Sequence, residues 1–331
     1  MSSPVRPGRF VSTGVLPAAT HVEDLIASAR EEFAAVSEGQ LSSVYPALAA
    51  ADPDQFGIAL ATVEGVVHQV GDAGVAVTLM SVSKPFAFAL ACADRGIDEV
   101  RRVIGVNATG MPFNSIEAVA RAEGGRTNPM VNSGAISTTS LAPGATDEDR
   151  WAWLRDGLGR FAGHPLDLDE TTLASARETN FRNRGIATLV RDAGGLAGDP
   201  LEAVDLYTRQ CCLLVSCVDL AVMGATLADG GVNPVTGEQV VSADVARATL
   251  AVMSIAGMYE TSGDWLLDVG VPAKSGISGG LMAVSPGKGG LGVFSPLLDG
   301  AGNSVRGQLV ARRLAADLGL DLLGSASEPR S

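Results

Sequence analysis

The sequence lacks an excess of positive charge and contains no long apolar run. Its 24 Lys and Arg residues are outnumbered by 37 Asp and Glu residues, which gives a net charge of -13. This charge disfavours nucleic acid and anionic membrane surfaces as partners. No apolar run reaches the roughly 18 residues of a membrane-spanning helix, and residues 1–20 contain no continuous apolar stretch typical of a secretory signal. We therefore expect a cytoplasmic protein that binds neither nucleic acid nor membranes.

Cysteine and histidine are also scarce. The four cysteines, Cys92, Cys211, Cys212 and Cys217, show no metal-binding spacing with the three histidines. Cys211 and Cys212 are adjacent in sequence and cannot easily pair with each other. The pattern predicts buried free thiols in a reducing compartment and no metal site.

Strand patterns occur at both ends of the chain, and helical patterns lie between them. Residues 57–70 and the two apolar runs around residues 287–290 predict hairpins, whereas residues 97–258 are mainly helical in pattern. The sequence therefore predicts an α+β fold, with a sheet built from the N- and C-terminal segments and a helical region inserted between them. The expected divisions are a flexible lead (1–20), a single domain (21–323) with an α/β part (about 21–85 and 259–323) and a helical part (about 86–258), and a flexible tail (324–331).

Lysine is the scarcest charged residue, with three copies among the 24 basic residues. Two of these lysines lie in short motifs, Ser81-Val82-Ser83-Lys84 and Lys274-Ser275-Gly276. A helix would make Ser81 and Lys84 neighbours at positions i and i+3, and the apolar, glycine-rich surroundings of Lys274 are compatible with an edge strand. Both motifs in this order are typical of serine acyl-transfer enzymes of the penicillin-recognising type.

The two motifs together could support acyl transfer. A serine such as Ser81 needs a base, and Lys84 can be that base only when its amine is neutral. Lowering a lysine pKa from about 10.4 to about 7 requires roughly 4–5 kcal/mol of differential environment. We expect apolar surroundings, with Lys274 as a second cation, to supply that difference. The backbone N–H groups of Ser81 and Ile277 are candidates for an oxyanion hole.

The chain resembles the serine-dependent glutaminases, which have the fold of β-lactamases and transpeptidases. The resemblance extends over about residues 25–320 in order. Its most specific runs are Asn128-Pro129-Met130-Val131-Asn132 and Pro272-Ala273-Lys274-Ser275-Gly276. The other matching runs are 81–84, 133–136, 182–183, 205–207, 225–231, 257–259, 277–280, 299 and 302–304.

The resemblance implies hydrolysis of L-glutamine to L-glutamate and ammonia through a glutamyl ester. Ser81 would be the nucleophile and Lys84 its base, while Tyr259 and Tyr45 would relay protons. The N–H groups of Ser81 and Ile277 would bind the oxyanion.

The same resemblance implies a binding site for the amino-acid end of the substrate. Asn132, Asn183 and Tyr207 would form that site, and Lys274 and Ser275 would support the catalytic groups. No metal or organic cofactor is implied, and a homodimer or homotetramer is expected because family members commonly form them.

Three departures from the family pattern bear on substrate choice. A glutamate that pairs with the substrate ammonium is usual where this chain has Ala176, and Glu178, two residues on, is the candidate replacement, although it need not point the same way. Asn107-Ala108-Thr109-Gly110 replaces a Glu-Pro-Ser-Gly run, and Met80 replaces a glutamine. These changes lead to the hypothesis of a weak glutaminase or of one that prefers a related amide.

Two alternatives remain open at the level of the sequence. A β-lactam-reactive hydrolase would carry Ser-x-Asn or Tyr-x-Asn between the two lysine motifs, and neither occurs between Lys84 and Lys274. A catalytically silent amino-acid or amide-binding protein would fit the three departures, but it would not need to retain Ser81, Lys84, Tyr259 and Lys274.

Overall fold

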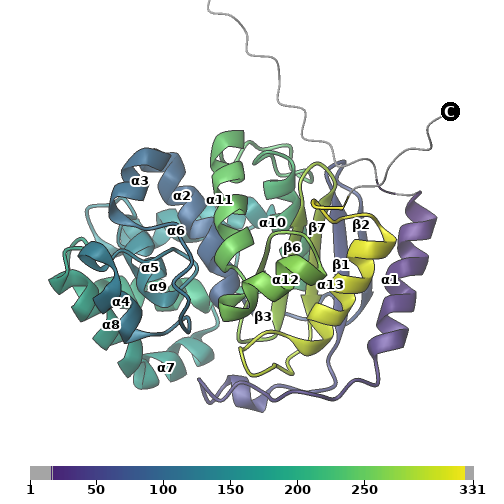
Figure 1. Cartoon of the computed structure of the whole chain (residues 1–331), viewed down its shortest axis with the longest axis horizontal. Helices are drawn as coiled ribbons and strands as arrows, with labels where there is room; N and C mark the ends of the chain where they lie inside the picture. The colour runs from purple at the N-terminus through teal and green to yellow at the C-terminus, as the bar shows by residue number, and fades with distance from the viewer. Residues whose placement is uncertain (1–15, 17, 325–331) are drawn as a thin grey trace, which may run out of the picture.

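The computed structural model describes residue 16 and residues 18–324, and it consists of a helical part beside a part that contains the main sheet (Figure 1). The helices are α1 (Ala19–Phe33), α2 (Lys84–Arg95), α3 (Ile97–Val103), α4 (Ile116–Arg121), α5 (Asn132–Thr139), α6 (Asp147–Ala162), α7 (Glu170–Thr179), α8 (Phe181–Asp192), α9 (Pro200–Cys211), α10 (Cys217–Ala228), α11 (Ala243–Ala256), α12 (Ser262–Asp268) and α13 (Val305–Asp317). The strands are β1 (Gly57–Thr62), β2 (Val67–Gly71), β3 (Val77–Thr78), β4 (Leu214–Val215), β5 (Ala273–Ser275), β6 (Gly280–Ser285) and β7 (Gly289–Phe294). The expected lead and tail fall largely outside the described residues, although α1 already begins at Ala19.

The main sheet joins the two ends of the chain. Its strands are antiparallel and lie in the order β2-β1-β7-β6-β5. The hairpins expected over residues 57–70 and around residues 287–290 are β1–β2 and β6–β7. The pairing of β1 with β7 confirms a sheet built from both terminal segments. Lys274 lies on β5, an edge strand, as expected.

The two faces of this sheet carry side chains of different size. Ile58 and Leu60 on β1 belong to the apolar cluster with α1 and α13, whereas the alternate β1 residues are alanines that pack with α10. On β7, a Cβ atom at Gly290 or Gly292 would lie 2.3 or 2.2 Å from backbone oxygens of α10. Glycine at these positions therefore allows α10 to lie directly on the sheet.

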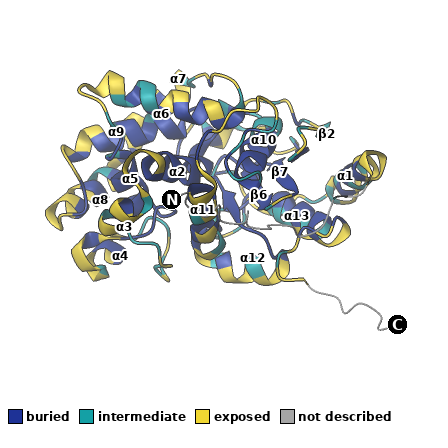
Figure 2. Ribbon diagram, turned by 90° about the horizontal axis from the view of Figure 1, so that it is seen from above, coloured by how far each residue is buried: buried dark blue, intermediate teal, exposed yellow. Residues whose placement is uncertain are grey.

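Two helices connect the sheet with the helical part. α10 falls within the segment expected as the helical part, yet it packs on β1, β6 and β7. α2 is buried along its first nine residues, Lys84 through Cys92, and it occupies the centre of the molecule in Figure 2. Because α2 is buried on all sides, its N-terminus lies inside the protein. Among the described helices, none is both long enough and apolar enough to cross a membrane.

Candidate active site

Ser81 lies in a single 3₁₀ turn, η2 (Met80–Ser83), that leads directly into α2. Ser81 and Lys84 are thus joined by a 3₁₀ turn, which is tighter than the α-helical turn that would also make them neighbours. The turn is fixed by the Ser83 hydroxyl, which donates to the Met80 carbonyl at 2.7 Å and accepts from Gln210 Nε2 at 2.7 Å. The tight turn brings Ser81 to the start of the buried helix that carries Lys84.

The backbone is strained on both sides of the Ser81 hydroxyl. Met80, which precedes Ser81, has a φ of 45°, and Tyr259, whose phenol is near enough to Ser81 for that side chain to influence its pKa, has a φ of 56°. Among the described residues, no other non-glycine residue has a positive φ. Such conformations cost on the order of 1–3 kcal/mol each and cluster at functional sites. The positions of the side chains around Ser81 are therefore maintained at a cost in the stability of the fold.

The Lys84 amine is buried and hydrogen-bonded beside the turn. Its Nζ donates to the Asn132 side-chain oxygen at 2.7 Å and to the Met130 carbonyl at 3.3 Å. Burial lowers the pKa of Lys84 to about 7, so a large fraction of this amine is neutral near neutral pH. The described hydrogen bonds of Lys84 Nζ go to Met130 and Asn132, and none goes to Ser81. Hydrogen bonds between catalytic groups are often long without substrate and become shorter when substrate binds.

Lys274 and Tyr259 pack against each other on the other side of Ser81. Lys274 Nζ lies 4.1 Å from the centre of the Tyr259 ring and donates to the carbonyls of Gly257 and Ser275 at 2.8 and 2.6 Å. The Tyr259 hydroxyl donates to the same Ser275 carbonyl at 2.9 Å. Burial, followed by repulsion from Lys84, lowers the pKa of Lys274 well below its usual range. Burial is the cause of the lowered pKa of Lys84, and the expected effect of Lys274 on that pKa is not found. The repulsion between the two amines lowers the pKa of Lys274 instead.

Ser275 contributes its carbonyl to this arrangement, whereas its hydroxyl is buried without a hydrogen-bond partner in the described part of the chain. The phenol of Tyr259 is neutral because burial raises its pKa above the usual range. Tyr259 is therefore a neutral hydroxyl next to Ser81, able to accept a proton and donate another.

A pocket of about 110 Å³ opens beside Ser81. Six residues predicted from the sequence line it, and they are Tyr45, Ser81, Asn132, Asn183, Tyr207 and Ile277. Asn132 links three of the predicted residues, because its oxygen accepts from Lys84 and from the Tyr207 hydroxyl (3.4 Å), and its Nδ2 donates to Asn183 Oδ1 at 2.9 Å. The polar wall of the pocket and the buried lysine thus form one hydrogen-bonded network.

The two predicted oxyanion donors are available in this structure. Within the described residues, neither the backbone N–H of Ser81 nor that of Ile277 makes a hydrogen bond. Both residues line the same pocket. An oxyanion hole requires two such free donors beside one carbonyl oxygen.

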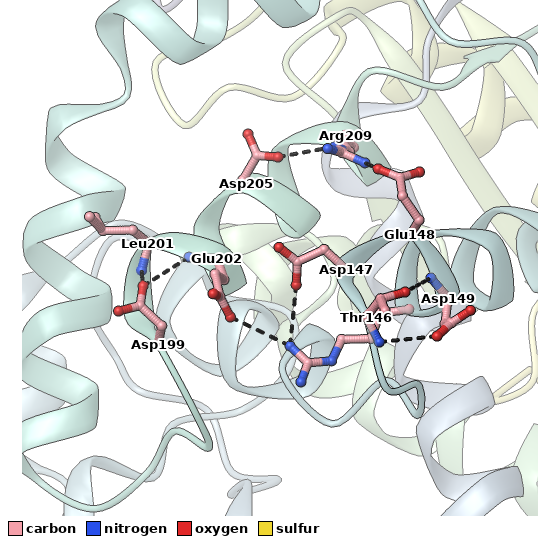
Figure 3. Close-up of polar contacts among 10 residues, drawn as sticks. Thr146, Asp147, Glu148, Asp149, Asp199, Leu201, Glu202, Asp205 and Arg209 are labelled. Carbon is pink, nitrogen blue, oxygen red and sulfur yellow. Dashed lines mark hydrogen bonds and ion pairs between the residues drawn. The ribbon is translucent and has the colours of Figure 1, made fainter.

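Helix α9 presents reactive groups on one face and ion pairs on the opposite face. Tyr207 and Cys211, one helical turn apart, line the pocket. Asp205 and Arg209 point away from it, and Figure 3 shows Arg209 between Asp205 and Glu148 of α6. The pocket face of α9 is thereby fixed from behind by its charged face.

The structure separates Glu178 from the other predicted site residues. Its side chain is exposed at the end of α7 and does not line the pocket. Ala176, on the same helix, is completely buried in an apolar cluster that also contains Tyr45 and Tyr207. Glu178 therefore does not replace a carboxylate at the position of Ala176.

Several pocket residues were not predicted from the sequence as site residues. They include Thr179, Asn180, Arg182, Thr208 and Cys211. Cys211 could have been found from its i+4 spacing to Tyr207 on one helix face. Asn180 and Thr179 lie at the junction of α7 and α8, and no local pattern indicates that this junction faces the pocket.

Among the described residues, no group of three or more His, Cys, Asp or Glu side chains is arranged to hold a metal ion. The four cysteines are buried and free, as expected.

Comparison with known proteins identifies the family. The family model described as "Glutaminase" matches residues 39–323. The chain belongs to the glutaminase family. "Glutaminase 2" of Yersinia pestis is 57% identical over 320 residues, which cover 97% of this chain and 94% of that relative. A "Glutaminase" of Mycobacterium ulcerans is 44% identical over 93% of this chain and 96% of that relative.

Solved glutaminase structures share the fold. The structure described as "Probable glutaminase ybaS" superimposes with a TM-score of 0.91 at 41% identity, over 93% of this chain and 100% of that chain. The Bacillus subtilis glutaminase YbgJ, in a covalent complex with 5-oxo-L-norleucine, gives a TM-score of 0.81 at 32% identity, over 92% and 99% of the two chains. The predicted α+β, β-lactamase-like fold and the predicted amidohydrolase class are confirmed.

Proposed function

We propose that this glutaminase hydrolyses the side-chain amide of L-glutamine to L-glutamate and ammonia through a covalent ester on Ser81. The Ser81 oxygen attacks the amide carbon, and neutral Lys84 accepts the hydroxyl proton. The N–H groups of Ser81 and Ile277 stabilise the oxyanion. A proton delivered through Tyr259 lets ammonia leave as the carbon–nitrogen bond breaks.

In the second half of the reaction, water attacks the ester and restores Ser81. Tyr259 or Tyr45 passes the proton of that water back to the departing serine oxygen, and L-glutamate leaves. Asn132, Asn183 and Tyr207 orient the substrate so that its amide carbon lies at Ser81. The ester intermediate divides amide hydrolysis into two steps with lower barriers.

One observation carries this proposal: a buried lysine amine with a pKa near 7 donates to Asn132, which lines the same pocket as Ser81. The covalent complex of YbgJ with 5-oxo-L-norleucine supports it, because that adduct formed by reaction of a relative with a diazo ketone of the same chain length as glutamine. A noncovalent mechanism would need no such serine and lysine pair.

The test is ammonia release from L-glutamine by the purified protein, compared with Ser81→Ala and with Ser28→Ala as a matched control on α1. We expect turnover that disappears in Ser81→Ala and persists in Ser28→Ala. Treatment with 6-diazo-5-oxo-L-norleucine should add one equivalent by intact mass, and the addition should require Ser81. Turnover that survives in Ser81→Ala would rule out the ester mechanism.

Absence of turnover by the intact protein, together with measurable L-glutamine binding, would instead support a silent binding protein. Labelling of Ser81 by a fluorescent penicillin would support a β-lactam-reactive enzyme. The two results are distinguishable because only the second requires a covalent bond to Ser81.

We further propose that the chain functions in the cytoplasm as a homodimer or homotetramer, with residues 21–323 as one domain. The four free thiols support a reducing compartment. Light scattering of the purified protein tests the assembly, and a monomeric mass would contradict it.

A further inference from the structure

The charge of the pocket is one-sided. Among the residues that line it, the only side chain with a permanent charge is Arg182, and none is Asp or Glu. Lys84 adds a second basic group through its bond to Asn132. An amino acid carries both a carboxylate and an ammonium group, and this wall offers an opposite charge only to the carboxylate.

The hydrogen-bonding groups of the wall favour the same end of the substrate. The Asn132 oxygen already accepts from Lys84 and Tyr207, and the Asn183 oxygen accepts from Asn132. The guanidinium of Arg182 uses its Nε on the Asn114 carbonyl and has further N–H groups to donate. The pocket wall therefore has more free hydrogen-bond donors than free acceptors, and its free acceptors carry no charge.

The nearby carboxylates do not correct this imbalance. Glu178 is exposed outside the pocket. Glu260 lines a different cavity, together with Tyr259. Asp299 accepts three backbone N–H groups and the Gln308 amide. A substrate ammonium would thus leave water without gaining an anionic partner, which typically weakens binding by about 10- to 100-fold relative to a paired ammonium.

We propose that this site recognises its substrate by a carboxylate and a primary amide and gains nothing from a charged α-nitrogen. Five-carbon ω-amides that lack the ammonium, such as glutaramate, are then hydrolysed at least as efficiently as L-glutamine. N-acylated glutamine belongs to the same substrate class wherever the pocket mouth admits the acyl group. This inference rests on the proposed amidase function and specifies the substrate class of the same site.

The decisive experiment compares kcat/KM for L-glutamine and glutaramate, which differ only in the α-amino group. We expect the value for glutaramate to equal or exceed that for L-glutamine. A value for glutaramate at least 10-fold below that for L-glutamine would overturn the proposal. N-acetyl-L-glutamine, measured in parallel, reports how large an uncharged α-substituent the site accepts.

A binding measurement separates this inference from the proposed mechanism. Calorimetric titration of Ser81→Ala with glutarate and with L-glutamate compares the two product-like ligands without any need for turnover. Glutarate binding as tight as or tighter than L-glutamate binding supports the inference even if the ester mechanism is wrong. Tighter L-glutamate binding contradicts it even if the mechanism is right.

A reversal variant tests the physical cause. Asn180 lines the pocket and donates to Thr208 at 2.9 Å, so Asn180→Asp adds a carboxylate of nearly the same shape. We expect the ratio of kcat/KM for L-glutamine to that for glutaramate to rise about 10-fold or more. Gln69→Glu, on the exposed face of β2, adds the same charge outside the pocket and should leave the ratio unchanged. An equal ratio in both variants would contradict the electrostatic explanation.

Discussion

The protonation state of Lys84 is the residue-scale property on which the proposed reaction depends. Its aliphatic chain and amine are 1% exposed, and the Asn132 and Met130 oxygens are its only described polar partners. Among the described groups that influence the pKa of this amine there is no carboxylate, so burial favours the neutral form. A base with a pKa near the working pH is in the range where proton transfer is efficient.

This property predicts a rise of activity with pH. The pKa of Lys84 is lowered to about 7, so the amine is protonated and inactive below that pH and neutral above it. We expect kcat/KM for L-glutamine to rise about tenfold per pH unit below about pH 7 and to level off above it. A stopped ammonia assay from about pH 5.5 to about pH 8.5 would measure the profile. A flat profile over this range would contradict Lys84 as the base.

Ala176 allows a second residue-scale prediction. Ala176→Glu would place a carboxylate beside Tyr45 and Tyr207, and we expect it to lower KM for L-glutamine by about 10- to 100-fold. Because Ala176 is fully buried, the larger side chain should also lower the free energy of unfolding by about 1–3 kcal/mol. Ala174→Glu, exposed on the same helix, is the control. An unchanged KM in the folded variant would show that position 176 does not face the substrate.

At the element scale, ion pairs fix the relative position of the two helices that form one side of the pocket. Asp205 on α9 accepts from Arg177 of α7 through two hydrogen bonds of 2.7 and 2.9 Å, and from Arg209 at 3.0 Å. Burial alone would raise the pKa of Asp205, but Arg177 and Arg209 together lower it. The bidentate geometry favours one orientation of α7 against α9.

We expect Asp205→Asn to lower the free energy of unfolding by about 1 kcal/mol, because the pair is partly exposed and screened by solvent. KM for L-glutamine should rise, since Thr179 ends α7, Asn180 follows it and Tyr207 lies on α9. Urea unfolding and steady-state kinetics measure the two effects. Asp156→Asn, whose partner Arg155 is exposed, removes the same charge and should change neither quantity. Equal effects of both variants would show that the charge itself, and not the tie between helices, is responsible.

At the scale of the whole molecule, the N- and C-terminal segments are held together by more than the sheet. Arg306 on α13 is 4% exposed and donates to three backbone carbonyls near the N-terminal end of the chain, those of Val36, Ala34 and Pro53, at 2.7, 3.1 and 3.3 Å. These contacts join positions more than 250 residues apart in the sequence. The guanidinium thus fixes the segment that leads from α1 toward β1.

Arg306→Met should therefore destabilise the fold without changing the site. Three partly buried backbone carbonyls would lose their charged donor, and we expect the free energy of unfolding to fall by about 2–4 kcal/mol. Arg312→Met, more exposed on the same helix, should change it by less than about 0.5 kcal/mol. Denaturant unfolding measures both, and kcat of the folded enzyme should be retained. Similar stabilities of the two variants would contradict the role given to Arg306.

The sequence by itself predicted a sheet built from both ends of the chain with helices between them, and it predicted six of the residues that line the pocket. Residue patterns and glycine placement were sufficient for β1–β2 and β6–β7, because hairpins are encoded by neighbouring residues. The lysine motifs and the resemblance named Ser81, Lys84, Asn132, Tyr207 and Tyr259 because these residues lie in short, specific runs.

Tertiary structure alone decided the features that depend on residues distant in sequence. The positive φ of Met80 and of Tyr259, the packing of α10 on the sheet and the exposure of Glu178 have no local signal. The sequence showed that Ala176 stands where a glutamate is usual, but that Glu178 and the other carboxylates do not line the pocket became evident only when α7, α8 and α9 were placed around Ser81. The charge of a pocket is a sum over segments brought together by folding, and no single segment contains it.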